Sequence, residues 1–374
     1  MSPIRLHRLE LEQFRNYQHE ALQLNSSRIL ILGNNGQGKS NLLEAVELLG
    51  TLHSCRSSYD YELINHGKDM SIVRGLTNHG DLLEIEFRKY GGRQVRRNGK
   101  RLDRQGDLLL SMRCVSFSSL DLHLLRGEPV QRRQWLDKIV LQLEPVYSEL
   151  IKKYGKLLKQ RYQLLRKNSG QSNVEDLLDI FDQQLSLIGV RVHRRRYRAL
   201  NRLQPFAEHW QKKLSNGGEV LSLDYQRGST LPKEENEQVW REALIAQLKA
   251  QREQELRTYR CIVGPHRDEI GIFLNGQMAR RYASGGQKRT IVLALKMAEL
   301  NLIHQIYEDP PILILDDVMA ELDSDRQELL LDAIEKEYQC LVSATNISVL
   351  TPSWYRSSQI VKVSSGKLIS VEQN

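Results

Sequence analysis

The sequence predicts an α/β fold in which a discontinuous P-loop head carries an inserted helical arm. Near residue 33 an apolar strand runs into a glycine-rich loop, and near residue 315 a second apolar strand ends in two aspartates. Between these strands, over roughly residues 131–256, the apolar period changes from 2 to 3.6. We therefore expect residues 1–120 and 259–374 to form the head, and residues 121–258 to form the arm.

The N-terminal segment predicts strands that lead into the glycine-rich loop. Apolar and polar residues alternate over residues 4–32, which favours two antiparallel strands with a bend near Asn16. Ile29–Leu32 is an unbroken apolar run, typical of a strand buried on both faces of a parallel sheet.

The loop that follows fits G-x-x-x-x-G-K-[ST], a phosphate-binding pattern. Its glycines allow backbone N–H groups to face an anion, Lys39 can reach the β- and γ-phosphates, and Ser40 can ligate Mg²⁺. The next helix directs its N-terminus at the phosphates, and Gly50 is its expected C-cap. The predicted ATP-binding residues of this loop are Gly33, Asn34, Asn35, Gly36, Gln37, Gly38, Lys39 and Ser40.

Three further strands are expected at residues 71–76, 82–90 and 93–97, with turn signals at their ends. Basic residues crowd the last hairpin between Arg93 and Arg101. They either discourage edge-to-edge strand pairing or contact nucleic acid, and the sequence leaves both interpretations open.

The arm is expected to contain an αα-hairpin. Helices are predicted from residue 131 to Pro145, from 146 to 165, and from a capping box at Ser172 and Glu175 to Pro205. A strand at residues 220–225 and a helix at 235–256 follow.

The arm also holds the positive charge of the chain. The formal net charge is +8, and residues 151–214 contain fifteen Lys/Arg against five Asp/Glu. Such a surplus neutralises nucleic-acid phosphates without reading sequence, although a solvated helical face is the alternative interpretation. The candidate DNA-binding residues are Arg191, Arg194, Arg195, Arg196, Arg198, Lys152 and Lys153.

The C-terminal part supplies the rest of a nucleotide site. Strands are expected at residues 261–263 and 270–274, followed by Ser284–Gln287 at the start of a helix, where two glycines and a hydroxyl can hold an anion. The apolar strand from Pro311 ends in Asp316, a candidate Mg²⁺ ligand, and Asp317, which could polarise the attacking water.

In order, these motifs resemble Walker A, the signature motif, Walker B and the D-loop of ABC-type ATPases. Five further stretches are similar to the RecF family of bacterial DNA repair proteins, and the resemblance covers nearly the whole chain. These stretches are Phe14–Tyr17, Asn35–Glu44, Gly127–Asp137, Gly264–Asp268 and Ala283–Arg289.

The resemblance implies an ABC/SMC-like ATPase head with a short arm, and a homodimer that encloses two ATP molecules. Lys39 and Asp317 would be catalytic, Ser40 and Asp316 would hold Mg²⁺, and Asp323 would lie at the dimer seam. The signature residues that would act on ATP across the dimer are Ser284, Gly285, Gly286 and Gln287.

The resemblance also implies a biological role. ATP binding would close a clamp on single-stranded, gapped or double-stranded DNA, and slow, DNA-stimulated hydrolysis would open it. RecR and RecO would act with the protein at single-strand gaps and help RecA to displace single-strand-binding protein. DNA repair, replication and the SOS response are the implied processes.

Three positions depart from the wider ABC pattern. Asp317 stands in place of glutamate, Ala283 in place of leucine, and Ser343–Thr345 where a histidine switch is usual. One alternative function is that of an ATPase subunit of another ABC-type system. DNA-stimulated ATPase activity would distinguish the repair protein from such a subunit. The other is a structural DNA-binding protein with a vestigial ATP site, in which Lys39→Arg would leave DNA binding unaffected.

Composition predicts a cytoplasmic location without a membrane partner. No apolar run reaches the roughly 18 residues that a membrane span requires, and the start of the sequence lacks the apolar core of a signal peptide. Four scattered cysteines read as reduced thiols rather than as a zinc site or a disulfide framework.

Overall fold

The computed structural model describes residues 2–57, 59–167, 174–232, 235–334, 338–347 and 352–373. The α/β fold predicted from the sequence is confirmed. The chain divides into two compact units, each described by itself below. Unit 1 contains residues 1–123, 206–219 and 284–374, and unit 2 contains residues 124–205 and 220–283.

Unit 1 contains a six-stranded sheet shared by both halves of the chain. Its strand order is β15-β14-β3-β13-β12-β8, and all neighbours are parallel except β15, which runs antiparallel to β14. Because β3 and β8 pair with strands from the C-terminal part, neither half completes this sheet alone. The strands are β3 (Arg28–Leu32), β8 (Cys114–Ser118), β12 (Ile312–Asp316), β13 (Cys340–Ala344), β14 (Gln359–Ser364) and β15 (Lys367–Gln373).

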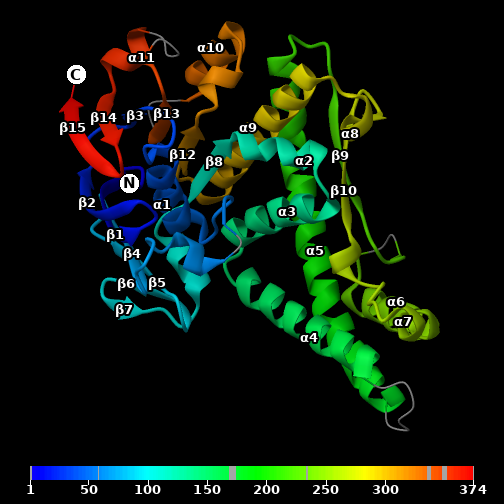
Figure 1. Cartoon of the computed structure of the whole chain (residues 1–374). Helices are drawn as coiled ribbons and strands as arrows, with labels where there is room; N and C mark the ends of the chain where they lie inside the picture. The colour runs from blue at the N-terminus through cyan, green and yellow to red at the C-terminus, as the bar shows by residue number, and fades with distance from the viewer. Residues whose placement is uncertain are drawn as a thin grey trace. The chain divides into compact units, whose positions relative to one another are not determined.

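A second, antiparallel sheet in unit 1 has the order β2-β1-β4-β5-β6-β7. Helix α1 (Lys39–Thr51) contacts strands of both sheets and lies between them (Figure 1). The strands are β1 (Leu6–Phe14), β2 (Tyr17–Gln23), β4 (Met70–Thr77), β5 (Leu82–Arg88), β6 (Gly92–Arg97) and β7 (Lys100–Arg101). The expected antiparallel pair before the P-loop is therefore present, and so are the three later strands.

The prediction that Gly50 caps α1 is wrong. The C-cap is Leu52, which has a positive φ of 58°, whereas Gly50 lies inside the last turn of the helix. A Cβ atom on Gly50 would be 2.8 Å from the backbone nitrogen of Cys114 in β8. Glycine is therefore required there for close packing of the helix on the strand, and not for a left-handed cap.

Helices complete unit 1. The longest is α9 (Gly285–Tyr307), which begins at the signature motif, contacts β8 and is almost entirely buried along its middle. The other regular elements are α10 (Ser324–Ala333), α11 (Pro352–Arg356) and the 3-10 turns η1 (Asp60–Leu63), η2 (Gln105–Leu110), η3 (Ser119–Leu122) and η5 (Met319–Glu321).

Unit 2 is mainly helical and contains the predicted αα-hairpin, formed by α4 (Tyr147–Lys167) and the unit 2 part of α5 (Val174–Leu214). Its three-stranded sheet has the order β11-β10-β9, and Ser172 of the predicted capping box lies outside the described residues. The remaining elements are α2 (His123–Arg126), α3 (Pro129–Leu143), β9 (Leu221–Gln226), α6 (Glu237–Ala250), α7 (Arg252–Thr258), η4 (Pro265–Arg267), β10 (Glu269–Leu274), β11 (Gln277–Met278) and α8 (Ala279–Tyr282).

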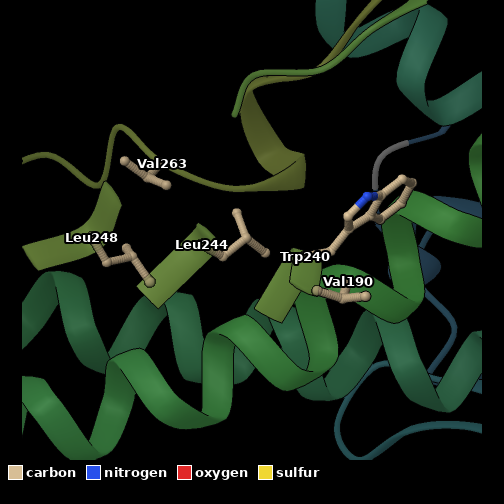
Figure 2. Packing of buried hydrophobic residues seen from close by; sticks show 5 residues of the cluster. All are labelled: Val190, Trp240, Leu244, Leu248 and Val263. Carbon is tan, nitrogen blue, oxygen red and sulfur yellow. The ribbon is translucent and has the colours of Figure 1, made fainter. Parts of the chain in front are cut away.

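Apolar side chains from α5 and α6 form one core of unit 2. Figure 2 shows Trp240, Leu244 and Leu248 of α6 beside Val190 of α5 and Val263 of the segment before η4. Burial of each such side chain stabilises the fold by about 1.5–3 kcal/mol relative to exposure. Two further clusters join α4 to α5, so the hairpin is packed along its length.

Three further element predictions, two in the arm and one in the C-terminal part of the head, need correction. Helix α5 continues through Pro205 to Leu214, because buried side chains beyond it, including Trp210, outweigh the hydrogen bond that proline lacks. Residues 261–263 form no strand. The single helix expected at 235–256 is divided at Gln251, where α6 ends and α7 begins.

Unit 2 and the predicted arm have different bounds. Residues 259–283 lie in unit 2, because β10 pairs with β9 along six residues. Residues 206–219 lie in unit 1, where Trp210 donates a hydrogen bond to Asn301 of α9. Within the described part of the chain, no helix is long and apolar enough to cross a membrane.

Candidate nucleotide-binding site

The P-loop connects β3 to α1 and is held by the turn between β1 and β2. The Tyr17 hydroxyl donates to the Gly38 carbonyl at 3.0 Å, and the Asn16 amide donates to the Gln37 carbonyl at 3.2 Å. Gly38 has a φ of 118°, and a Cβ atom there would lie 2.8 Å from Asn16 Nδ2. Both the backbone conformation and this brace therefore require glycine at position 38.

The other side of the loop is held by the turn between β14 and β15. Gly366 N donates to Gln37 O at 2.9 Å, and Ser365 N donates to Gln37 Oε1 at 2.7 Å. Asn34, Asn35 and Gly36 are exposed at the tip. The predicted phosphate-binding residues thus form a braced loop with an accessible tip.

Lys39 lies inside this loop. Its side chain is 3% exposed, and Nζ donates to Gly33 O at 2.9 Å and to Asn34 O at 3.2 Å. Neither partner is a carboxylate, and Lys39 forms no ion pair with any residue that the structure describes. Both contacts hold the ammonium group against the backbone of the loop.

Ser40 and Asp316 are brought together although they are far apart in sequence. Ser40 Oγ donates to Asp316 Oδ1 at 2.9 Å. Strand β13 lies between β3 and β12, and its buried Ser343 donates to Asp316 Oδ1 at 2.7 Å. The carboxyl ends of three parallel strands therefore meet at one polar cluster.

Asp317 belongs to the same cluster. Its φ of 54° turns the chain directly after β12, and its backbone N–H donates to Ser343 Oγ at 2.8 Å. Asp317 Oδ1 lies 3.4 Å from the same hydroxyl. The two adjacent carboxylates thus share Ser343, as expected if both face one phosphate.

The geometry of Ser40 and Asp316 fits a magnesium ion. Mg²⁺ takes oxygen ligands at about 2.0–2.1 Å in octahedral geometry, which separates neighbouring ligands by about 2.9 Å. That is the separation of Ser40 Oγ and Asp316 Oδ1. Burial raises the pKa of the Asp316 carboxyl, and the neighbouring Asp317 adds to this rise. A bound cation would act in the opposite direction and favour the ionised carboxylate.

The signature motif caps α9. Ser284 Oγ accepts from Gln287 N at 3.2 Å, and Gln287 Oε1 accepts from Ser284 N at 2.7 Å. Gln287 Nε2 in turn donates to Glu219 Oε1 at 2.8 Å. Ser284, Gly285 and Gly286 are exposed, so their hydroxyl and backbone N–H groups are accessible.

Asp323 caps α10 in a similar way. Its carboxylate accepts from Arg326 N at 3.0 Å and forms an ion pair with the Arg326 guanidinium. These contacts, led by the backbone hydrogen bond, lower the pKa of Asp323. Among the described residues, no hydrogen bond or ion pair joins Asp323 or Ser284–Gln287 to the P-loop of the same chain.

One predicted DNA contact, Arg196, must be corrected. Its side chain is only 5% exposed and makes a two-pronged pair with Asp137, with both distances 2.8 Å. It also donates to Asp268 at 2.9 Å. Arg196 is therefore part of the buried structure of unit 2, and its guanidinium does not face solvent.

The other predicted arginines are more exposed but are paired with carboxylates. Arg191 and Arg194 pair with Glu237, Arg195 with Glu144, and Arg198 with Glu235. On α4, Lys152 pairs with Glu149 at 3.2 Å, while Lys153 is exposed. The positive surface predicted along α5 is thus largely offset by acidic residues from other segments.

The sequence did not reveal two supports of the site. Arg15 binds Glu44 of α1 through two hydrogen bonds of 2.7 and 2.9 Å, which ties the β1–β2 turn to the P-loop helix. Ser343 bridges Asp316 and Asp317. The signals were the segment Phe14–Tyr17 and the unusual serine at the switch position, but their partners are distant in sequence.

Known proteins resemble this chain over nearly its whole length. The family model described as "RecF/RecN/SMC N terminal domain" matches residues 5–367. The chain is 53% identical over 354 residues to "DNA replication and repair protein RecF" of Parasynechococcus marenigrum (strain WH8102), covering 94% of this chain and 97% of the relative. It is 45% identical to the protein of the same description from Synechocystis sp. (strain ATCC 27184 / PCC 6803 / Kazusa), with 97% of each chain covered.

Solved structures give the same result. A structure described as "recombination mediator protein RecF-ATP in RecFOR pathway" has a TM-score of 0.90 and 31% identity, and the match covers 100% of this chain and 98% of the other. An Smc head bound to the C-winged helix domain of ScpA is similar in fold, with a TM-score of 0.54, 16% identity, and 99% and 97% of the two chains covered.

Proposed function

This chain belongs to the RecF family of DNA replication and repair proteins, and from that premise we propose that it is an ATP-dependent DNA clamp. The observation that carries the proposal is the contact between Ser40 and Asp316, with Ser343 joining Asp316 to Asp317. A P-loop serine beside an acidic residue at the end of a buried strand is the arrangement that a Mg·ATP site requires.

Each residue of the cluster has a proposed role. The P-loop backbone and Lys39 bind the phosphates, and Ser40 and Asp316 hold Mg²⁺, which would neutralise charge on the phosphates. Asp317 orients the attacking water by accepting a hydrogen bond from it. Because aspartate is shorter than glutamate by one methylene, we propose that hydrolysis is slow and that ATP acts mainly as a latch.

The second half of the site is proposed to come from another copy of the chain. Ser284, Gly285 and Gly286 offer a hydroxyl and backbone N–H groups at the N-terminus of a 23-residue helix, a favourable place for a γ-phosphate. The same groups have no described contact with the P-loop of their own chain. Binding of ATP would therefore join two copies, with Asp323 at the seam.

The partners proposed for the clamp follow from the family. They are single-stranded, gapped or double-stranded DNA in the cytoplasm, with RecR and RecO as fellow components and RecA as the protein loaded. The solved relatives are described as recombination mediators of the RecFOR pathway, which supports this assignment.

Sedimentation with and without ATP and Mg²⁺ tests the proposal. We expect the wild type to shift from monomer to dimer only when both are present, and Lys39→Arg to stay monomeric, because the point-charge ammonium fits this loop and a planar guanidinium does not. A dimer that forms equally without ATP, or in Lys39→Arg, would contradict the latch.

A further inference from the structure

A basic depression on unit 2 is lined by none of the arginines that the sequence singled out. Two neighbouring hollows of about 480 and 670 Å³ share Arg260 and Arg267 in their linings. Lys159 and Tyr162 of α4 line the first hollow as well. Among the described residues that line the two hollows, none is acidic.

No carboxylate of the described residues forms an ion pair with the cations that line this depression. Lys159 and Arg260 are exposed, and neither takes part in any ion pair found in the described part of the chain. Arg267 is exposed but anchored, since its Nε and Nη2 donate to the Cys261 carbonyl at 3.0 and 2.7 Å. These hydrogen bonds fix the guanidinium but leave its charge in place. Because the group is already fixed, less side-chain entropy is lost when an anion binds.

His266, which also lines the first hollow, is hydrogen-bonded at both ring nitrogens and neutral. His266 Nε2 donates to the Cys261 carbonyl at 2.9 Å, and its Nδ1 accepts from the Tyr154 hydroxyl at 2.7 Å. Burial lowers the pKa of His266 to about 4, so the ring carries no charge near neutral pH. The charge of the depression therefore comes from its lysine and arginines.

An exposed aromatic ring lies beside these cations. Tyr162 is 39% exposed and follows Lys159 by one helical turn, so both project from the same face of α4. Arg166 lies over the Tyr162 ring at 5.8 Å from its centroid and adds a further exposed cation. Cations next to an accessible ring are the combination that binds phosphates and stacks a base.

We propose that this depression, lined by Lys159, Tyr162, Arg260 and Arg267, binds the backbone of single-stranded nucleic acid and stacks one base on Tyr162. The inference rests on the proposed DNA clamp and places its single-strand contact on α4 and on the residues 260–267 rather than along α5. A single strand is favoured over a duplex because bases within a duplex are already stacked and cannot reach the ring.

The test measures binding of a labelled 15-nucleotide dT strand to the full-length protein over a range of salt concentrations. Lys159→Gln/Arg260→Gln removes two charges that have no described partner. Arg191→Gln/Arg198→Gln is the matched control, because it removes two charges that pair with Glu237 and Glu235. Each double variant loses two positive charges, so the two variants have the same net charge. Thermal melting of both variants serves to check that they are folded.

We expect the first variant to reduce the magnitude of the log–log salt slope by about 1.4, or about 0.7 for each lost phosphate contact, and the second to change it by less than half as much. Tyr162→Leu should weaken binding of dT about tenfold, leave the slope unchanged and not affect a duplex of equal length.

An equal or larger effect of Arg191→Gln/Arg198→Gln would overturn the placement of the site. An unchanged affinity for dT in Tyr162→Leu would overturn base stacking. If the wild type binds no DNA, the proposed clamp fails together with this inference. If the wild type binds but Lys159→Gln/Arg260→Gln binds with the same slope, only this inference fails.

Discussion

Gln287 is held at both ends of its side-chain amide. Its oxygen accepts from Ser284 N at 2.7 Å, and its nitrogen donates to Glu219 Oε1 at 2.8 Å. Glu219 is itself fixed by Gln211 Nε2 at 2.6 Å. A flip of the Gln287 amide would break both hydrogen bonds. Glu219 therefore positions Gln287, and Gln287 in turn orients Ser284 at the N-terminus of α9.

We expect Glu219→Ala to lower the kcat of DNA-stimulated ATP hydrolysis about tenfold, since a hydrogen bond to a charged group contributes about 1.5–3 kcal/mol. The KM for ATP should stay unchanged, because the P-loop is untouched. Glu208→Ala on the exposed face of α5 is the matched control. Equal kcat values for the two variants would show that Glu219 does not position the signature motif.

His266 makes stability depend on pH. Its folded pKa of about 4 lies below the ordinary value of 6.5, mainly because of burial, with the charges of Arg267 and Arg133 acting in the same direction and Asp268 opposing them. Between these two pH values the unfolded chain binds a proton that the folded chain does not. The free energy of unfolding should therefore fall as the pH is lowered from 6.5 towards 4.

At pH 5 this loss amounts to about 2 kcal/mol relative to pH 7.5. Urea unfolding of the wild type and of His266→Gln at both pH values measures it. Other groups contribute equally to both proteins, so the pH-dependent loss should be about 2 kcal/mol smaller in the variant. The same loss in both proteins would refute the role of His266.

The sequence predicted the positions of some site residues well and those of others poorly. Lys39 and Ser40 come after one strand with a local apolar pattern and Asp316 ends another, and Ser40 and Asp316 are in contact as the motifs predict. Arg196 could not be assigned correctly because its partners, Asp137 and Asp268, are 59 and 72 residues away. The burial of a charge depends on such distant partners, which a helical pattern does not contain.

At the scale of elements, a buried ion network joins α4, α5 and α7. Arg161 contacts Asp182 at 2.8 Å and Glu255 at 2.5 Å, and all three side chains are almost completely buried. Arg252 extends the network from α7 to Asp182 at 2.7 Å. Removing one member would leave buried charges of the others without compensation.

We therefore expect Arg161→Met to reduce the free energy of unfolding by about 3–5 kcal/mol, measured by urea denaturation. Arg257→Met provides the control, because Arg257 pairs with Glu253 on one exposed helix face. That substitution should produce no measurable change. A similar effect of the two substitutions would mean that the buried network does not hold the helices together.

The sequence predicted elements well where pairing and period are local. The strands β1, β2, β4, β5 and β6 were expected close to their observed positions. Strand β8 was not predicted, because its place in the sheet depends on pairing with β12, about 200 residues later. The passage of α5 through Pro205 likewise depends on packing in unit 1, where Trp210 is buried.

For the whole molecule, the arrangement of unit 1 explains why the nucleotide site needs both ends of the chain. The P-loop follows β3, Asp316 ends β12, and Ser343 lies near the end of β13. The signature motif begins α9 in the same unit but has no described contact with the P-loop. We propose that a second copy of the chain supplies the signature motif.

Mixing two inactive variants tests this claim most directly. Lys39→Ala disables the P-loop, and Ser284→Arg blocks the signature motif, so each variant alone should hydrolyse ATP poorly. If sites form across a two-fold dimer, an equal mixture should regain about a quarter to a half of the wild-type rate, because at least about half of the dimers are mixed and each has one intact site. A mixture no more active than the mean of the two variants would contradict a site shared between two copies.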